Sequence, residues 1–121
     1  MGTRRTLSAI VAGTGFEGRA SQIRAFCRIG SEIQLRREPD NLHHPEAIAV
    51  WLRASILWGL SRPWFQIGYI RSAVANSWAP KIDSGWMVVL SARINSLYAP
   101  IDNEHPRVSL AVEVEDRDLD A

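Results

Sequence analysis

The segment RVSLAVEVE, residues 107–115, alternates apolar residues with polar or small ones at a period of two. This period places Val108, Leu110, Val112 and Val114 on one face of an extended strand. A strand with one apolar face must cover that face with a partner sheet or helix, so the segment predicts a layered or closed β structure.

Five further stretches have strand composition: 5–14, 31–38, 47–60, 61–70 and 86–98. The third is long, and a hairpin broken near Ala54 and Ser55 is an alternative interpretation. Apolar residues recur at helical spacing in 21–29 and 71–83, and we expect Pro80 to end or bend the second helix. This pattern predicts a mostly β chain that forms a small, twisted, antiparallel barrel with one or two short helices.

The length and composition indicate one globular domain over residues 1–121. Hydrophobic residues make up 46% and charged residues 22%, without a linker or an internal repeat. No apolar run approaches the roughly 20 residues that cross a bilayer, so no membrane contact is expected. Cys27 is the only cysteine, which excludes an intrachain disulfide and favours a reducing, cytoplasmic location. We expect Cys27 to be a small buried residue.

The charge is distributed unevenly along the chain. Residues 113–121, EVEDRDLDA, carry five acidic residues and one basic residue, and predict a short acidic tail. Subtracting them from the 14 basic and 13 acidic residues of the whole chain leaves 13 and 8, a net charge of +5 over residues 1–112. Of the 14 basic residues 13 are arginines, which suit bidentate phosphate contacts. The body is therefore compatible with nucleic-acid binding.

GTGFEG, residues 13–18, satisfies the G-x-G-x-x-G pattern of dinucleotide-binding folds. That site needs a long helix directly after the glycines and recurring βα units, and neither follows here. We therefore interpret Gly13 and Gly15 as residues that shape a loop around Phe16.

The three histidines, His43, His44 and His105, suggest a metal or catalytic site only at first sight. Neighbouring side chains of an extended segment point to opposite faces, so adjacent histidines seldom share one ion. The chain has no HxH, HExxH or G-x-S-x-G spacing. We expect no metal, no cofactor and no enzymatic activity.

Tryptophans occur at 51, 58, 64, 78 and 86 and interleave with arginines. Aromatic rings beside arginines are what a single-strand-binding groove needs, at roughly 1–3 kcal/mol per stacked base. A small barrel also needs large residues for its interior, and we expect most tryptophans in the core or an apolar rim.

Three segments in order resemble the HIRAN domain family: VAGTGFEGR (11–19), REPDNLHHPEAIAVW (37–51) and IGYIRSAVANSWAPKIDSG (67–85). The resemblance implies a modified OB-like antiparallel barrel of about six strands with short helices, its core spanning about 10–115. It also implies binding to the 3′ end of single-stranded DNA in repair or replication-fork processing. In the family this module occurs attached to fork-remodelling helicases and, in bacteria, also as a standalone protein, so the chain resembles a standalone member with a helicase as a possible partner.

The resemblance further implies that seven residues contact DNA: Phe16, Asp40, Asn41, His43, His44, Tyr69 and Ser72. Arg19 and Arg71 are added as candidate DNA-binding arginines. Phe16 would stack on a base, and the residues of 40–44 would line the pocket for the terminal nucleotide. Tyr69 and Ser72 fall on positions that contact base or backbone, with Arg71 adjacent. Gly13, Gly15, Arg37 and Pro39 would shape and brace the loops.

Three departures from the family pattern bear on this interpretation. His44 stands where the family has an aspartate that binds the 3′-hydroxyl, and an imidazole lacks the carboxylate's charge and second oxygen. Leu42 replaces a frequent proline, and Ser72 stands where a basic residue can contact phosphate. The stretch 51–67 is longer and more aromatic than usual and could close part of the groove or bind a partner. A protein-interaction module on the same barrel is the alternative hypothesis.

Overall fold

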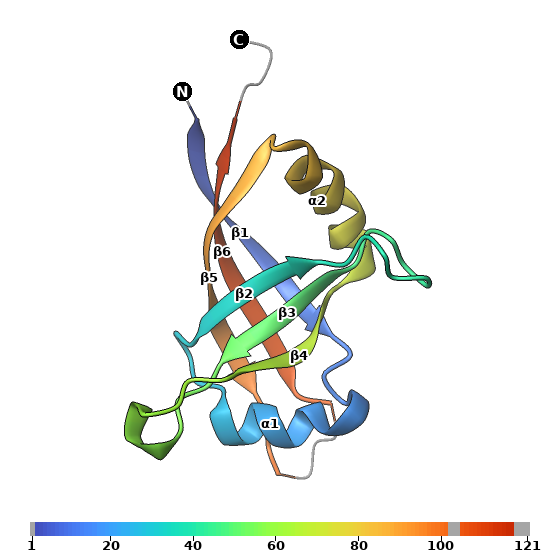
Figure 1. Cartoon of the computed structure of the whole chain (residues 1–121). Helices are drawn as coiled ribbons and strands as arrows, with labels where there is room; N and C mark the ends of the chain where they lie inside the picture. The colour runs from blue at the N-terminus through green and yellow to red at the C-terminus, as the bar shows by residue number, and fades with distance from the viewer. Residues whose placement is uncertain (1, 102–104, 118–121) are drawn as a thin grey trace.

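The computed structural model describes residues 2–101 and 105–117 and shows a closed six-stranded antiparallel barrel (Figure 1). The strands follow the order β1-β4-β3-β2-β5-β6 around the barrel. Their bounds are β1 Thr3–Ala12, β2 Glu32–Arg37, β3 Ile48–Arg53, β4 Trp64–Ile70, β5 Met87–Tyr98 and β6 Arg107–Asp116. Two α-helices, α1 Arg19–Phe26 and α2 Ser72–Ser84, and two short 3-10 turns, η1 Phe16–Gly18 and η2 Leu57–Gly59, connect them. The predicted barrel with short helices is confirmed.

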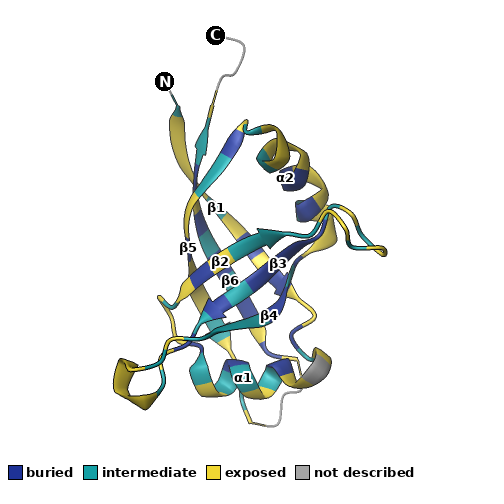
Figure 2. Ribbon diagram, in the orientation of Figure 1, coloured by how far each residue is buried: buried dark blue, intermediate teal, exposed yellow. Residues whose placement is uncertain are grey.

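Strand β6 lies between β1 and β5 and forms the longest ladders of the sheet. Its four alternating apolar residues are all buried, as the period-two pattern predicts (Figure 2). The strand continues to Asp116, which pairs with both Thr3 and Met87. The acidic tail predicted from residue 113 is therefore wrong for 113–116, because long neighbouring strands extend the pairing. Residues 118–121 lie outside the described residues.

Strand β3 lies at the centre of the other side of the barrel, between β2 and β4. Its side chains Ile48, Val50 and Leu52 are fully buried. The long strand expected over 47–60 ends at Arg53, where the chain leaves the sheet and returns through η2. The backbone of β4 approaches β1 so closely at Gly68 that a Cβ atom would overlap the Ala12 carbonyl oxygen.

Helix α1 packs against β4 and covers one end of the barrel. Ile23 and Cys27 are buried, and Phe26 stacks on Phe65 with ring centroids 5.3 Å apart. Burial raises the pKa of the Cys27 thiol to about 12, although Arg28 opposes the shift. The expectation that Cys27 behaves as a small buried residue is confirmed.

Helix α2 lies at the opposite end of the barrel (Figure 1). Ala75, Trp78 and Ala79 are buried on one of its faces. The helix continues through Pro80 to Ser84, and its C-cap residue Gly85 has a φ of 82°. Of the two outcomes expected at Pro80, an end or a bend of the helix, the end does not occur, and Ile82 beyond it still packs against the core. No helix among the described residues is long and apolar enough to cross a membrane.

Candidate nucleic-acid interface

The connection between β2 and β3, residues 38–47, is held in one shape by its own polar groups. Asn41 accepts hydrogen bonds through its side-chain oxygen from the backbone N–H groups of His43 and His44, both at 3.0 Å. The backbone N–H of Glu38 donates to the Ala47 carbonyl across the base of the loop at 3.0 Å. Asparagine favours such turns because its side chain satisfies backbone groups two or three residues away.

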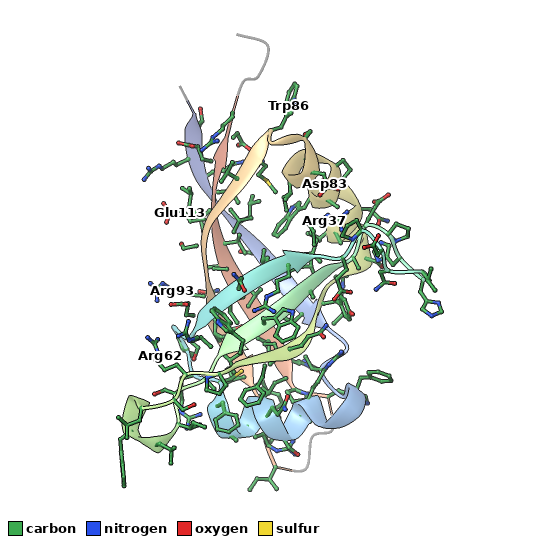
Figure 3. The ribbon with its side chains drawn as sticks, in the orientation of Figure 1. Arg37, Arg62, Asp83, Trp86, Arg93 and Glu113 are labelled. Atoms are coloured by element: carbon green, nitrogen blue, oxygen red, sulfur yellow. The ribbon has the colours of Figure 1, made fainter. Side chains whose placement is uncertain are left out.

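Arg37 ties this connection to helix α2. Its guanidinium donates to the Ala47 carbonyl at 2.7 Å and to the Pro45 carbonyl at 3.0 Å. It also makes two hydrogen bonds of 2.8 Å to the Asp83 carboxylate (Figure 3). The bond from Arg37 lowers the pKa of Asp83, and the same bond raises the pKa of Arg37. A bidentate arginine–carboxylate pair fixes orientation as well as distance.

A pocket of about 300 Å³ opens beside this loop, lined by Asn41, His43, His44, Ala47 and Tyr69. Its volume is at the low end for small-ligand sites in proteins. The Tyr69 hydroxyl donates to Glu38 at 2.9 Å, and the Asn41 amide donates to the same carboxylate oxygen at 3.1 Å. The pocket thus presents an amide, two imidazoles and a phenol, with a carboxylate behind them.

The His44 ring is anchored by a residue of α2 that sequence reasoning missed. The side-chain nitrogen of Asn76 faces three acceptors, His44 Nε2 at 2.7 Å, the Glu46 carboxylate at 3.0 Å and the Ser72 carbonyl at 3.2 Å. An amide oxygen in that position would face the two oxygen atoms, so we assign the nitrogen there. His44 Nε2 then accepts a hydrogen bond, and the neutral ring carries its proton on Nδ1.

Arg19 contacts the rings of two predicted site residues, Phe16 and Tyr69, through its guanidinium. Its guanidinium donates to the Gly13 carbonyl at 3.0 Å, and its central carbon lies 5.4 Å from the Phe16 ring centroid and 5.6 Å from that of Tyr69. Gly13 takes a φ of 74°, which favours glycine. Arg19 is almost fully buried, whereas Phe16 is 61% exposed. The guanidinium is attracted to the faces of both rings and links the two segments that carry them.

The remaining predicted site residues do not line the pocket that contains His43 and His44. Arg71 is exposed but lines two neighbouring pockets with Ile10 and Ser109, so the structure does not place it in the histidine pocket. Ser72 begins α2 and is exposed, and Asp40 is exposed in the loop. Gly15 precedes η1, and Pro39 occupies an exposed position in the turn. Within the described residues, no three His, Cys, Asp or Glu side chains gather as metal ligands.

The tryptophans depart from expectation. Of the five, Trp78 is buried in the core. Trp51 and Trp64 are half-buried on the outer surface of the barrel beneath arginine side chains, while Trp58 and Trp86 are exposed. Smaller aliphatic side chains fill the barrel instead, because six strands enclose a narrow interior.

Comparison with known proteins gives the family. The sequence model of the HIRAN domain matches residues 5–115. The chain belongs to the HIRAN domain family. HIRAN domains are DNA-binding modules and are not themselves catalytic, which supports nucleic-acid binding by this chain.

Two solved structures share the HIRAN chain's fold. The crystal structure of the HIRAN domain of human HLTF has a TM-score of 0.61 at 16% identity, covering 93% of this chain and 77% of the other. A crystal structure of a protein from Lactobacillus plantarum has a TM-score of 0.66 at 18% identity, covering 97% of this chain and 100% of the other. No curated protein sequence matches this chain significantly.

Proposed function

We propose that this HIRAN domain binds the 3′ end of single-stranded DNA in the pocket beside Tyr69. The observation that carries the proposal is the convergence of three segments distant in sequence. Arg19 contacts the rings of both Phe16 and Tyr69, and Tyr69 lines the same pocket as the 41–44 loop. Exposed aromatic faces beside a preformed polar pocket suit unstacked bases.

Each residue has a role in this proposal. Phe16 stacks on a base, and Asn41, His43 and His44 surround the terminal nucleotide. The family aspartate is replaced by His44, but Glu38 supplies a carboxylate one hydrogen bond from both Asn41 and Tyr69. Arg71 and the exposed Ser72 contact phosphates beside the pocket, and Asp40 stays at the solvent side of the loop.

The wider role follows from the same end-binding activity. A module that recognises a free 3′ end would direct a helicase or another partner to repair sites or stalled forks inside the cell. The domain itself supplies binding, and any hydrolysis belongs to the partner. The buried thiol of Cys27 fits a reducing compartment.

Fluorescence anisotropy with labelled oligonucleotides tests the proposal. We expect tighter binding to a free 3′-hydroxyl than to a 3′-phosphorylated end, and weaker binding as salt rises. Replacing Phe16 with alanine should cost about 1–3 kcal/mol of binding free energy. Tyr98→Ala is the matched control, because Tyr98 is 60% exposed against 61% for Phe16 and lies on β5.

Two results would reject parts of the proposal separately. Equal affinity for free and blocked ends would remove the end-specific claim and leave single-strand binding. No binding to any oligonucleotide at low salt would remove single-strand binding itself.

The alternative, a protein-interaction module, is favoured by the tip of the β3–β4 connection. Trp58 is fully exposed there, and Leu57 and Leu60 are exposed beside it. The segment 53–64 contains two arginines and no acidic residue, so the matching partner is a protein with an apolar pocket rimmed by carboxylates. Selecting peptides that bind the wild type but not Trp58→Ser tests this candidate. Recovery of peptides without an apolar anchor and acidic flanks would reject it.

A further inference from the structure

The outer face of β2, β3 and β4 continues directly from the candidate pocket. Arg36 pairs with Ala49, and Ala49 pairs with Tyr69, so these residues form one row across the three strands. Neighbouring strands lie about 4.8 Å apart, which puts the Cα atoms of Arg36 and Tyr69 roughly 10 Å from each other. A ligand that leaves the pocket past Tyr69 therefore meets this face without crossing another element.

The same face carries a stack of alternating arginines and tryptophans, which we call the outer Arg/Trp face: Arg36, Trp51, Arg53 and Trp64. The Arg36 guanidinium carbon lies 4.1 Å from the Trp51 ring centroid and 5.7 Å from that of Trp64. The Arg53 guanidinium carbon lies 5.1 Å from the Trp64 ring centroid. All four residues are half-buried. Guanidinium planes and indole rings are both surfaces on which nucleobases stack.

A second pocket adjoins the far end of this face. It has a volume of about 280 Å³. Its polar and aromatic lining comprises Glu32, Gln34, Trp64, Ser91 and Arg93. Trp64 belongs to both the stack and this pocket, and Gln34 is held by a 2.7 Å hydrogen bond from Arg36. An indole wall beside an amide and a guanidinium matches the edges and faces of a nucleobase.

Two donors of the outer Arg/Trp face have no hydrogen-bond partner in the part of the chain that the structure describes. Trp51 Nε1 and Arg53 Nε are covered by surrounding atoms yet make no hydrogen bond to the described residues. Both groups can only donate, and a ligand oxygen could accept from them only after the side chains that cover them shift. Unpaired covered donors are rare in folded proteins and require an explanation.

The charge of the face indicates an anionic ligand. Within β2, β3 and β4 the acidic residue is Glu32, and it lies opposite Arg93 of β5. Arg36 and Arg53 are not matched by carboxylates on these strands. A positively charged surface with aromatic stacking positions is the combination that single-strand binding uses.

We propose that the outer Arg/Trp face is a second binding subsite, which holds the bases of the DNA strand after it leaves the pocket at Tyr69. The subsite rests on the proposed function, since it extends the same bound strand. It makes affinity depend on oligonucleotide length. A short oligonucleotide that reaches only the pocket does not contact this face, whereas the bases of a longer one stack on Trp64 and Arg36.

Anisotropy with oligonucleotides of roughly four and roughly twelve nucleotides, a range that spans OB-fold site sizes, tests the subsite. Trp64→Ala should weaken binding of the longer oligonucleotide by roughly fivefold to a hundredfold and leave the shorter one unchanged. Trp64→Phe, which keeps an aromatic face, should recover most of the loss. Arg36→Gln should weaken the longer oligonucleotide several-fold, and Arg4→Gln, a charge removed from the far end of β1, should not.

The possible outcomes separate the two proposals. Unchanged affinity of Trp64→Ala and Arg36→Gln for the longer oligonucleotide overturns the subsite, while wild-type binding to both lengths would keep the end pocket. Absence of wild-type binding to either length overturns the proposed function and the subsite together. A loss of acidic-peptide binding in Trp64→Ala without any loss for oligonucleotides would assign the face to a protein and overturn the subsite. Thermal melting shows whether each variant is folded. If Trp64→Ala does not fold, the affinity of Arg36→Gln for the longer oligonucleotide decides whether the subsite exists.

Discussion

The connections at the two ends of β3 differ sharply although they span equal lengths of chain, residues 38–47 and 54–63 (Figure 1). In the first, side chains make most of the contacts: Asn41 caps two backbone N–H groups, and Arg37 ties the loop to α2. In the second, the hydrogen bonds found among the described residues join backbone groups, such as the two between Ile56 and Ser61. The first connection is held by a side-chain contact to another element, helix α2, whereas the second is held by backbone hydrogen bonds within its own segment.

The difference teaches how each connection can act. A loop fixed by side chains presents a preformed pocket, because its polar groups do not need to be ordered when a ligand binds. The other connection holds Leu57 and Trp58 in the left-handed region, at φ 53° and 55°, and exposes their side chains. Non-glycine residues there cost of order 1 kcal/mol each, and such strain often accompanies binding.

The largest expected effect comes from removing the brace. Arg37→Ala loses the bidentate pair to Asp83 and two bonds to loop carbonyls, and should lower the free energy of unfolding by about 3 kcal/mol. Urea denaturation measures the loss, with Arg36→Ala as the control from the neighbouring position. An equal loss in Arg36→Ala would show that the loop does not depend on this brace.

A smaller effect is expected from the turn itself. Asn41→Ala leaves the backbone N–H groups of His43 and His44 without their acceptor, and should cost about 1–2 kcal/mol. Hydrogen exchange at these two amides should accelerate. Ser55→Ala in the other connection should stay within about 0.5 kcal/mol. Unchanged exchange at His43 and His44 would contradict the role of Asn41.

The pair between Arg37 and Asp83 predicts a pH dependence. Since Arg37 lowers the pKa of Asp83, the pair stabilises the fold above the unfolded-state value of about 3.9. That stability is lost as the pH falls through the lower pKa of the folded state. Asp83 is half exposed, so the contribution stays below about 1 kcal/mol. Wild type and Asp83→Asn should differ in unfolding free energy at about pH 6 and converge at about pH 2. A constant difference would refute this linkage.

The smallest effect should appear at the strained tip. Trp58→Asn removes a fully exposed side chain and introduces a residue that tolerates the left-handed conformation. We expect the unfolding free energy to rise by about 0.5 kcal/mol, detected as a slightly higher melting temperature. Destabilisation would mean that Trp58 packs against the barrel, and the contrast between the two connections would be weaker.

The parts of the fold that could be predicted rest on local patterns. The alternation from Val108 to Val114 identified a strand with one buried face. In a strand, the face to which a side chain points depends only on its position along the strand. At Pro80 the local chemistry left both an end and a bend of the helix open, and only the packing of Ile82 against the core shows that the helix continues. The end of β3 at Arg53 was also uncertain from the sequence. Ile56 and Leu57 beyond it are apolar, so local composition does not show whether the strand continues.

The candidate site was predictable only as a set of segments. The resemblance brought together 11–19, 37–51 and 67–85, but the residues that connect them escaped notice. Asn76 meets His44 from 32 positions away, and Glu38 meets Tyr69 from 31 positions away. Neither pair follows a spacing rule, because the contacts exist only when α2 and β4 pack beside the loop.

The sequence by itself determined the period of the strands, the presence of a single cysteine, the excess of arginine and the family segments. These are properties of neighbouring residues, and they hold in any arrangement of the chain. The tertiary structure alone decided which arginines meet which rings: Arg19 between Phe16 and Tyr69, and Arg36 over Trp51. Such meetings depend on strand register and barrel closure, which long-range packing of the whole core selects.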